Sequence, residues 1–317
     1  MDFNDVREVV LRIISELSRV LVGKELLIKH VVATLVAGGH VLIEGPPGVA
    51  KTLLAKALAK AIGGEFRRVQ GNPDLLPTDL IGYYIRGLDG SVRFVKGPVF
   101  TNVLMFDELN RTPTRVQSAL LQVMAEYQVS IEGTTYEVLR PFHIIATEVP
   151  TEEEFGTYPL TLTLRDRFWI KCTSGYSSVD EEFEVVKRSD KIYLIDVSEV
   201  SSVVDLSSFR ELQKSIDKFV YVDDRVIKYI VDLANYLRSH QLVKLGPSHR
   251  GSIFMYRISK VLALINGRDY VIPDDVKELA IEVFTHRIEL RRGAEVEGRT
   301  PQDLVNEALS KVPVPKE

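Results

Sequence analysis

The octapeptide Gly45-Pro46-Pro47-Gly48-Val49-Ala50-Lys51-Thr52 lies between a short apolar segment, residues 40–44, and a segment rich in helix-forming residues, 51–62. Apolar strand, glycine-rich turn and helix, in that order, are the context that a phosphate-binding loop requires. The octapeptide matches the pattern of that loop except at Ala50, where glycine is usual. The alternative is an unrelated Gly-Pro turn before a helix, but the flanking segments favour the phosphate-binding loop.

The chemistry of such a loop depends on main-chain N–H groups and two side chains. Glycines let the N–H groups turn inward around an anion, and the N-terminus of the following helix adds partial positive charge. We expect Lys51 to reach the β- and γ-phosphates of a nucleoside triphosphate and the hydroxyl of Thr52 to bind Mg²⁺. The whole octapeptide is therefore predicted to bind ATP.

A second element of the predicted site is the pair of carboxylates that follows the apolar segment 103–106. The sequence there is Val-Leu-Met-Phe, and Asp107 and Glu108 come next. A buried strand delivers such residues to the carboxyl edge of a sheet, where ligands of open α/β sheets bind. We expect Asp107 to hold the Mg²⁺ shell and Glu108 to act as the general base that polarises the attacking water. An acidic loop without a ligand is the alternative.

The order of the segments indicates the fold class. Helical patterns alternate with continuous apolar strands through residues 1–200, which favours a doubly wound α/β domain with a parallel sheet. Residues 129–136, with Gly133 at a turn, are typical of a β-hairpin. Serines cluster near residue 200, and only helical patterns follow. We therefore predict a nucleotide-binding core, 1–200, and an all-helical lid domain, 201–317.

Composition restricts the class of protein further. Of 317 residues, 45% are hydrophobic and 26% charged, and the net charge of −4 argues against a protein that coats nucleic acid. Cys172 is the one cysteine, so no internal disulfide forms and a reducing compartment is expected. The acidic start of the chain is unlike a signal peptide, and no apolar run is long enough to span a bilayer. These features predict a cytoplasmic protein without a membrane span.

The motifs together resemble the MoxR family of AAA+ ATPases, a group of P-loop proteins. The resemblance covers roughly residues 20–290 and depends on the order and spacing of its segments. The segments that carry it are the octapeptide 45–52, Asp74–Gly82, Gly97–Phe100, Asp107–Arg111, Gln117–Leu121, Gly156–Leu160, Asp166–Phe168, Gly246–Arg250 and Gly267–Val271.

The resemblance implies further site residues. Arg167 would be an arginine finger that reaches the γ-phosphate of a neighbouring subunit, with Arg165 as the competing candidate. Arg250 would be a second sensor that moves with the lid onto the nucleotide. Val22 and Gly23 would line the adenine pocket. The plainer alternatives are a surface ion pair of Arg167 with Asp166 or another acid, a solvated Arg250, and simple helix packing at residues 22–23.

One position departs from the family pattern. The family has a polar sensor, usually Asn, at the position that Val149 occupies here. Valine has no hydrogen-bonding side chain, so it does not orient a water molecule. Thr147 and Glu148 are the two candidates to replace this sensor.

The function implied is that of a mechanochemical chaperone which uses ATP and Mg²⁺ to remodel or mature protein complexes. The resemblance also implies a homo-oligomeric, hexameric ring, a partner with a von Willebrand factor A domain and a protein client, with residues 83–86 near a segment that faces the pore or partner. One alternative is a helicase-related motor that depends on nucleic acid and tracks with the hairpin near residues 130–138, although Glu132 and Glu137 suit phosphate poorly. Another is a nucleotide-dependent scaffold that hydrolyses slowly.

Overall fold

The computed structural model describes residues 1–150, 156–188, 197–296 and 298–315. Its centre is a five-stranded sheet in the order β2-β5-β8-β1-β9, in which every neighbouring pair is parallel. The strands are β1 (Val41–Glu44), β2 (Phe66–Gln70), β5 (Val103–Asp107), β8 (His143–Glu148) and β9 (Ile170–Thr173). The predicted parallel α/β sheet is confirmed, and β9 is a strand that the sequence analysis did not place.

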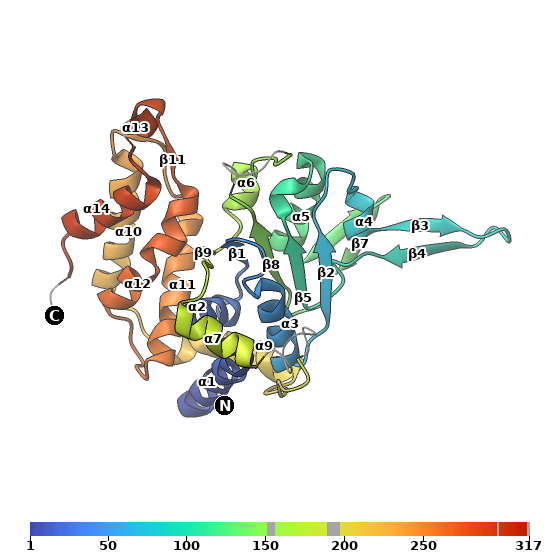
Figure 1. Ribbon diagram of the computed structural model, residues 1–317, viewed down its shortest axis with the longest axis horizontal. Coiled ribbons are helices and arrows are strands. Elements are labelled where there is room, and N and C mark those ends of the chain that lie inside the picture. The colour runs from blue at the N-terminus through green and yellow to red at the C-terminus, as the bar shows by residue number, and fades with distance from the viewer. Residues whose placement is uncertain (151–155, 189–196, 297, 316–317) are drawn as a thin grey trace.

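Helices cover both faces of this sheet because its central strands β1, β5 and β8 are buried on both sides. Val103 and Met105 of β5 pack into one buried cluster, whereas Leu104 and Phe106 pack into the other. The first cluster takes side chains from α1 (Phe3–Val20), α2 (Glu25–Val36) and α3 (Lys51–Ala61). The second takes them from α4 (Pro77–Ile81), α5 (Thr114–Glu126) and α6 (Leu162–Arg165). The doubly wound architecture is therefore confirmed (Figure 1).

Two hairpins extend from the core. The hairpin β6 (Gln128–Ile131) and β7 (Thr134–Glu137) is the predicted one. The other, β3 (Gly82–Arg86) and β4 (Val92–Lys96), was not predicted as strands and projects far from the body of the molecule (Figure 1). The hydroxyls of Tyr84 and Tyr136 lie 2.6 Å apart and join the two hairpins.

The C-terminal part of the chain is mainly helical. Among the described residues its helices are α9 (Leu206–Phe219), α10 (Asp224–Ser239), α11 (His249–Ile265), α12 (Pro273–Phe284), α13 (Arg292–Val296) and α14 (Pro301–Lys311), with the 3-10 turn η2 (Thr285–Arg287). Helix α7 (Val179–Lys187) precedes this part and lies within the predicted core. The helical lid is thus confirmed, with one addition. A short antiparallel ribbon, β10 (Val243–Leu245) and β11 (Glu289–Leu290), lies within it.

Lid and core share buried surface. The cluster that holds α1–α3 also contains Leu264 of α11 and Val283 of α12. The rings of Trp169, before β9, and Phe254, on α11, are stacked with centroids 4.3 Å apart. The boundary between residues 200 and 201 stays a prediction, because packing is continuous across it. None of the helices in the described part of the chain is long and apolar enough to cross a membrane.

Candidate active site

The phosphate-binding loop turns sharply between β1 and α3, as the motif predicts. A Cβ atom on Gly45 would lie 2.1 Å from the carbonyl oxygen of Ser174, so only glycine fits there. Ala50 occupies the left-handed region, with φ of 62° and ψ of 21°, immediately before the helix starts at Lys51. A residue with a Cβ pays about 1–2 kcal/mol in this region. This explains why glycine is usual at that position and shows that alanine still permits the turn.

Lys51 folds back over the loop. Its ammonium donates to the carbonyl oxygens of Gly45, at 2.6 Å, and Pro46, at 3.0 Å. Burial lowers the pKa of Lys51 below its ordinary value, and the carboxylates of Asp107 and Glu108 oppose that shift. The lysine of the loop and the two acids after β5 therefore act on one another electrostatically at the same edge of the sheet.

Asp107 is the centre of the polar contacts at this edge. Thr52 Oγ1 donates to its Oδ2 at 3.3 Å, and Thr147 Oγ1 donates to its Oδ1 at 3.2 Å. Arg68 of β2 also donates to Oδ2, from Nε at 2.6 Å. The sequence analysis missed Arg68, whose guanidinium is the cationic partner of the carboxylate that was expected to hold Mg²⁺.

Glu108 directly follows the strand and has a positive φ of 53°. Its carboxylate forms an ion pair with Arg111 Nε at 2.8 Å, one turn further along the chain. Its main-chain N–H donates to Thr147 Oγ1 at 2.8 Å. Arg111 and Thr147 therefore fix the position of Glu108 beside the phosphate-binding loop.

The two candidates for the missing polar sensor differ in their surroundings. Thr147 is 2% exposed and contacts both acidic residues, as described above. Glu148 instead forms an ion pair with Lys171 at 2.6 Å. Val149 is buried, and its main chain bonds to the side chain of Asn110. Thr147 is thus the polar side chain that the structure brings to the acidic pair.

The residues around Asp107 fit a magnesium ion. Mg²⁺ ligands at 2.0–2.1 Å in octahedral geometry are about 2.9 Å apart, close to the 3.3 Å between Thr52 Oγ1 and Asp107 Oδ2. Among the described residues there is no group of three or more His, Cys, Asp and Glu side chains that could form a metal site of their own. One carboxylate and one hydroxyl are the few protein ligands typical of a Mg²⁺ that also binds phosphate oxygens.

The proposed adenine residues lie next to the loop. A pocket of about 200 Å³ is lined by Val22, Gly48, Val49 and Ala50, and by Tyr176 and Val185 from the segment around α7. Gly23 faces α7 instead, since a Cβ atom there would lie 2.1 Å from Glu181 Cδ. The structure therefore brings Val22 to the phosphate-binding loop, whereas Gly23 lets α7 approach.

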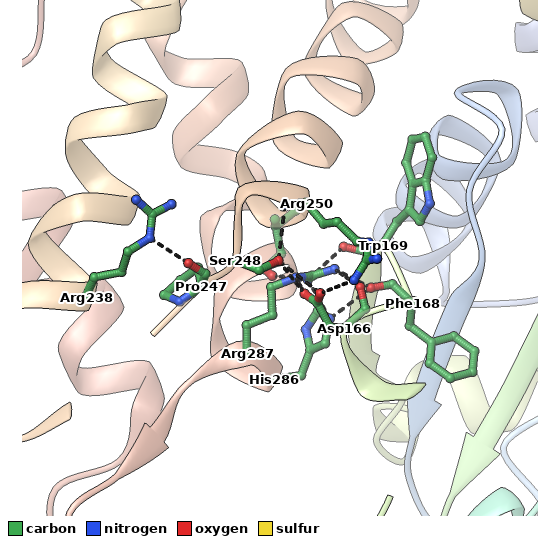
Figure 2. A network of polar contacts seen from close by, with 10 residues as sticks. Asp166, Phe168, Trp169, Arg238, Pro247, Ser248, Arg250, His286 and Arg287 are labelled. Carbon is green, nitrogen blue, oxygen red and sulfur yellow. Dashed lines mark hydrogen bonds and ion pairs between the residues drawn. The ribbon is translucent and has the colours of Figure 1, made fainter. Parts of the chain in front are cut away.

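Asp166 connects the core to the lid (Figure 2). Its carboxylate accepts hydrogen bonds from Ser248 Oγ at 2.9 Å, Arg250 Nη1 at 3.0 Å and Arg287 Nε at 3.1 Å. Arg287 is buried, and burial lowers its pKa to about 10. Its guanidinium also donates to the main-chain oxygens of Phe168 and Trp169. Asp166 thus pairs with two lid arginines, which the sequence analysis did not foresee.

Arg167 lies away from the phosphate-binding loop of its own chain. Two residues later, the N–H of Trp169 donates to the carbonyl of His40 at 2.8 Å, at the start of β1, whereas the loop follows the end of that strand. Burial, and then the guanidinium of Arg250, lower the pKa of Arg167. Arg250 is therefore close to Arg167 and bound to Asp166, rather than at the loop. Burial lowers the pKa of the competing Arg165, and the carboxylates of Glu148 and Glu289 oppose that shift.

Comparisons with known proteins identify the family of the chain. Residues 40–170 match the ATPase family associated with various cellular activities (AAA), and residues 235–308 match the AAA lid domain. The Uncharacterized protein YeaC of Bacillus subtilis (strain 168) is 40% identical over 314 residues, which are 98% of this chain and 96% of that protein. Chaperone MoxR1 of Mycobacterium tuberculosis is 39% identical, over 96% of this chain and 82% of that protein.

A solved structure supports the fold as a whole. The crystal structure of a putative ATPase from Cytophaga hutchinsonii superposes with a TM-score of 0.90 at 37% identity, covering 99% of this chain and 97% of that one. Fold, loop and acidic pair define an AAA+ ATPase. Within that class, the chain belongs to the MoxR family.

Proposed function

We propose that this chain hydrolyses ATP with Mg²⁺ at the phosphate-binding loop, and that hydrolysis drives chaperone-like remodelling or maturation of protein complexes. The observation that carries the first part is the convergence of Lys51, Thr52, Asp107 and Glu108 at one edge of the sheet. Family membership and the likeness to a protein named Chaperone MoxR1 support the second part.

The residues would divide the work as follows. The inward N–H groups of residues 45–52 and the ammonium of Lys51 bind the phosphates, while Thr52 and Asp107 hold Mg²⁺. When bound, Mg²⁺ would neutralise part of the negative charge of the triphosphate. Glu108, positioned by Arg111, accepts a proton from the attacking water. Arg68 donates to Asp107 Oδ2, so a cation bound to that oxygen would lie beside its guanidinium.

Thr147 takes the role of the first sensor in this proposal. Its hydroxyl bridges the carboxylate of Asp107 and the main chain of Glu108, so it fixes the two acids relative to one another. This contact favours hydrolysis over a scaffold that merely binds nucleotide. A motor that tracks nucleic acid is less well supported, because Glu132 and Glu137 of the β6–β7 hairpin are exposed carboxylates.

Arg167 would act on a neighbouring subunit, and Arg250 would move with the lid onto the nucleotide. Both belong to the surface around Asp166, away from their own phosphate-binding loop. From this surface Arg167 would reach the γ-phosphate of a neighbouring subunit, which requires a heterologous contact that closes into a ring. A hexamer, a partner with a von Willebrand factor A domain and a protein client are the assembly that the family resemblance suggests.

The phosphate-binding loop is tested by removing its lysine. Lys51→Ala should abolish binding of a fluorescent ATP analogue, because the ammonium neutralises the β- and γ-phosphates. The matched control is Lys56→Ala, which alters another lysine of α3. Binding should be unchanged in the control. Normal affinity of the Lys51→Ala protein would refute the assignment of the loop.

A further inference from the structure

A cleft rich in arginine and lysine lies far from the described site, at the edge where the sheet strands begin. It has a volume of about 390 Å³ and lies between the end of α5, the start of β8, and α9 and α11. We call it the basic cleft and define it by Tyr127, Arg140, Arg210, Lys214 and Arg257. Nothing in the proposed hydrolysis uses these residues.

The cations of the basic cleft are poorly neutralised. Asp217 is the one carboxylate among the described lining residues, and Lys260 already binds it at 2.9 Å. Arg257 reaches it only at 3.9 Å. No carboxylate of the described chain lies within 4 Å of the nitrogen atoms of Arg210 or Lys214. The cleft therefore carries positive charge that a second molecule could neutralise.

The walls and floor of the cleft add apolar surface. The guanidinium of Arg140 stacks over the ring of Tyr127 at 4.5 Å, and Phe142 and Ile216 also line the cleft. His143 is neutral there, because burial lowers its pKa to about 4. An acidic and partly apolar ligand is the complement of such a surface.

The basic cleft continues the surface that holds the proposed finger. Arg257 is seven residues beyond Arg250 on α11, which places it two turns along the same face and about 10 Å away. Arg250 in turn forms an ion pair at 3.0 Å with Asp166, the residue that precedes Arg167 in the chain. If the nucleotide of a neighbouring copy contacts Arg167, the surface around the nucleotide pocket of that copy therefore faces the basic cleft.

Helix α7 is what lies near that pocket. Glu182 and Val185 line the pocket next to the phosphate-binding loop. The nine residues of α7 include four carboxylates, Asp180, Glu181, Glu182 and Glu184, and one lysine. Its apolar stripe is uncovered by described residues, since Val179 is 84%, Phe183 65% and Val186 63% exposed. An acidic helix with an exposed apolar stripe matches the basic cleft in charge and character.

We propose that α7 of a neighbouring copy of this chain docks into the basic cleft and forms the contact that orders the ring. Asp180 and Glu184 of α7 are four residues apart, as are Arg210 and Lys214 of α9. The two residues of each pair are therefore about 6 Å apart along their helix axis, so α7 laid beside α9 can bring both carboxylates to both cations. The inference rests on the proposed finger that acts across the interface, because that finger fixes which surfaces meet.

Charge reversal tests this contact through assembly. The Arg210→Glu/Lys214→Glu protein should need at least about tenfold more protein for half-maximal assembly in a non-hydrolysable ATP analogue, measured by sedimentation velocity. Asp180→Lys/Glu184→Lys should show the same loss. A mixture of the two defective proteins should assemble again, because each reversed surface then meets a reversed partner while the other surfaces stay unchanged.

Controls separate this contact from folding and from the finger. Each variant should bind the fluorescent ATP analogue as the wild type does, since its own phosphate-binding loop is intact. Arg167→Ala should assemble normally and lose only hydrolysis. If Arg167→Ala hydrolyses normally while the reversed proteins fail to assemble and rescue one another, the finger is wrong and the docking contact stands.

Other results would overturn the docking contact. Assembly of either reversed protein at wild-type concentrations would do so, as would a mixture no better than its components. Wild-type protein that never assembles would exclude a second copy as the occupant. Binding of inorganic pyrophosphate to the Lys51→Ala protein that depends on Arg210 and Lys214, with assembly unaffected, would make the cleft a small-anion site instead.

Discussion

Thr147 shows how one hydroxyl can link two functional carboxylates. It donates to Asp107 and accepts from the N–H of Glu108, and it is buried on β8 between them and the sheet. A buried hydroxyl that bonds to both residues fixes the position of Asp107 relative to Glu108. The position two residues later, where the family pattern has its polar sensor, contributes only main-chain atoms.

Thr147→Val tests this role with little change in side-chain shape. The variant leaves the N–H of Glu108 and one oxygen of Asp107 without their partner, an effect worth about 1–3 kcal/mol. We expect kcat to fall roughly tenfold while KM for ATP stays unchanged. Thr147→Ser keeps the hydroxyl and should stay near the wild-type rate. A Thr147→Val protein with undiminished kcat would remove Thr147 from the mechanism.

Sequence patterns predicted some of the polar contacts at this scale but not others. Asp107 and Glu108 could be foreseen because a run of apolar residues directly precedes them. Arg68 could not, because its contact with Asp107 depends on the pairing of β2 with β5, in which Arg68 lies opposite Met105. The partners of Asp166 come from the lid, at residues 248, 250 and 287, and no local spacing indicates them.

At the scale of elements, α2 and α12 are joined by an ionic cluster. His30 contacts Glu278 at 3.0 Å and Glu282 at 3.4 Å, and Lys29 contacts Glu278 at 2.8 Å. Burial alone would lower the pKa of His30, but hydrogen bonds and charge from the two carboxylates raise it above its ordinary value. The hydrogen bond with His30, above all, holds the pKa of Glu278 at about 2.

These shifts predict how the cluster depends on pH. The raised pKa of His30 means that its contribution is complete below the ordinary value of 6.5 and is lost as pH rises through the folded-state pKa. The lowered pKa of Glu278 means that its contribution is complete above 4.5 and is lost as pH falls toward about 2. The cluster should therefore stabilise the contact between α2 and α12 most at mildly acidic pH.

Thermal unfolding of Glu278→Gln measures this dependence. The loss in Tm relative to wild type should be greater at pH 6 than at pH 9 by about 2 °C, because the charge on His30 that Glu278 stabilises is lost as pH rises through the raised pKa of His30. The exposed Glu8→Gln on α1 is the control and should show no such difference. Equal losses at the two pH values would contradict the account.

Periodicity predicted the long elements better than the short ones. Helices such as α1 and α10 have a clear apolar stripe, so their existence could be foreseen. The strands of the β10–β11 ribbon have only three and two residues, too few to show any period. The β3–β4 hairpin lies mostly in solvent, and exposed strands lack the buried alternating face on which prediction depends.

At the scale of the whole molecule, the fold class followed from the order of the motifs, while the relation of lid to core did not. The side chains that fill the cluster between α1 and α11 come from segments more than 200 residues apart, and hydrophobic patterns do not specify which apolar faces meet. That relation binds Arg250 to Asp166, the residue that precedes Arg167 in the chain.

Mixed rings test whether Arg167 acts across an interface between subunits. Arg167→Ala alone should lose about 10³–10⁵ in hydrolysis rate, as expected for an arginine finger. Lys51→Ala keeps the finger but cannot bind nucleotide. Co-assembled in equal amounts, the two should recover roughly a quarter of the wild-type rate, since random neighbours join an intact loop to an intact finger that often. Mixed rings as inactive as their parents would refute the role in trans.

In the proposed mechanism, Glu108 is the base that activates water, and the phosphate-binding loop binds ATP independently of it. The most direct measurement is phosphate release by Glu108→Gln together with the ATP that the protein retains. We expect affinity for ATP to stay at the wild-type level while phosphate release falls by about 10²–10⁴-fold, so that unhydrolysed ATP accumulates on the protein. Phosphate release within twofold of the wild-type rate would contradict the mechanism.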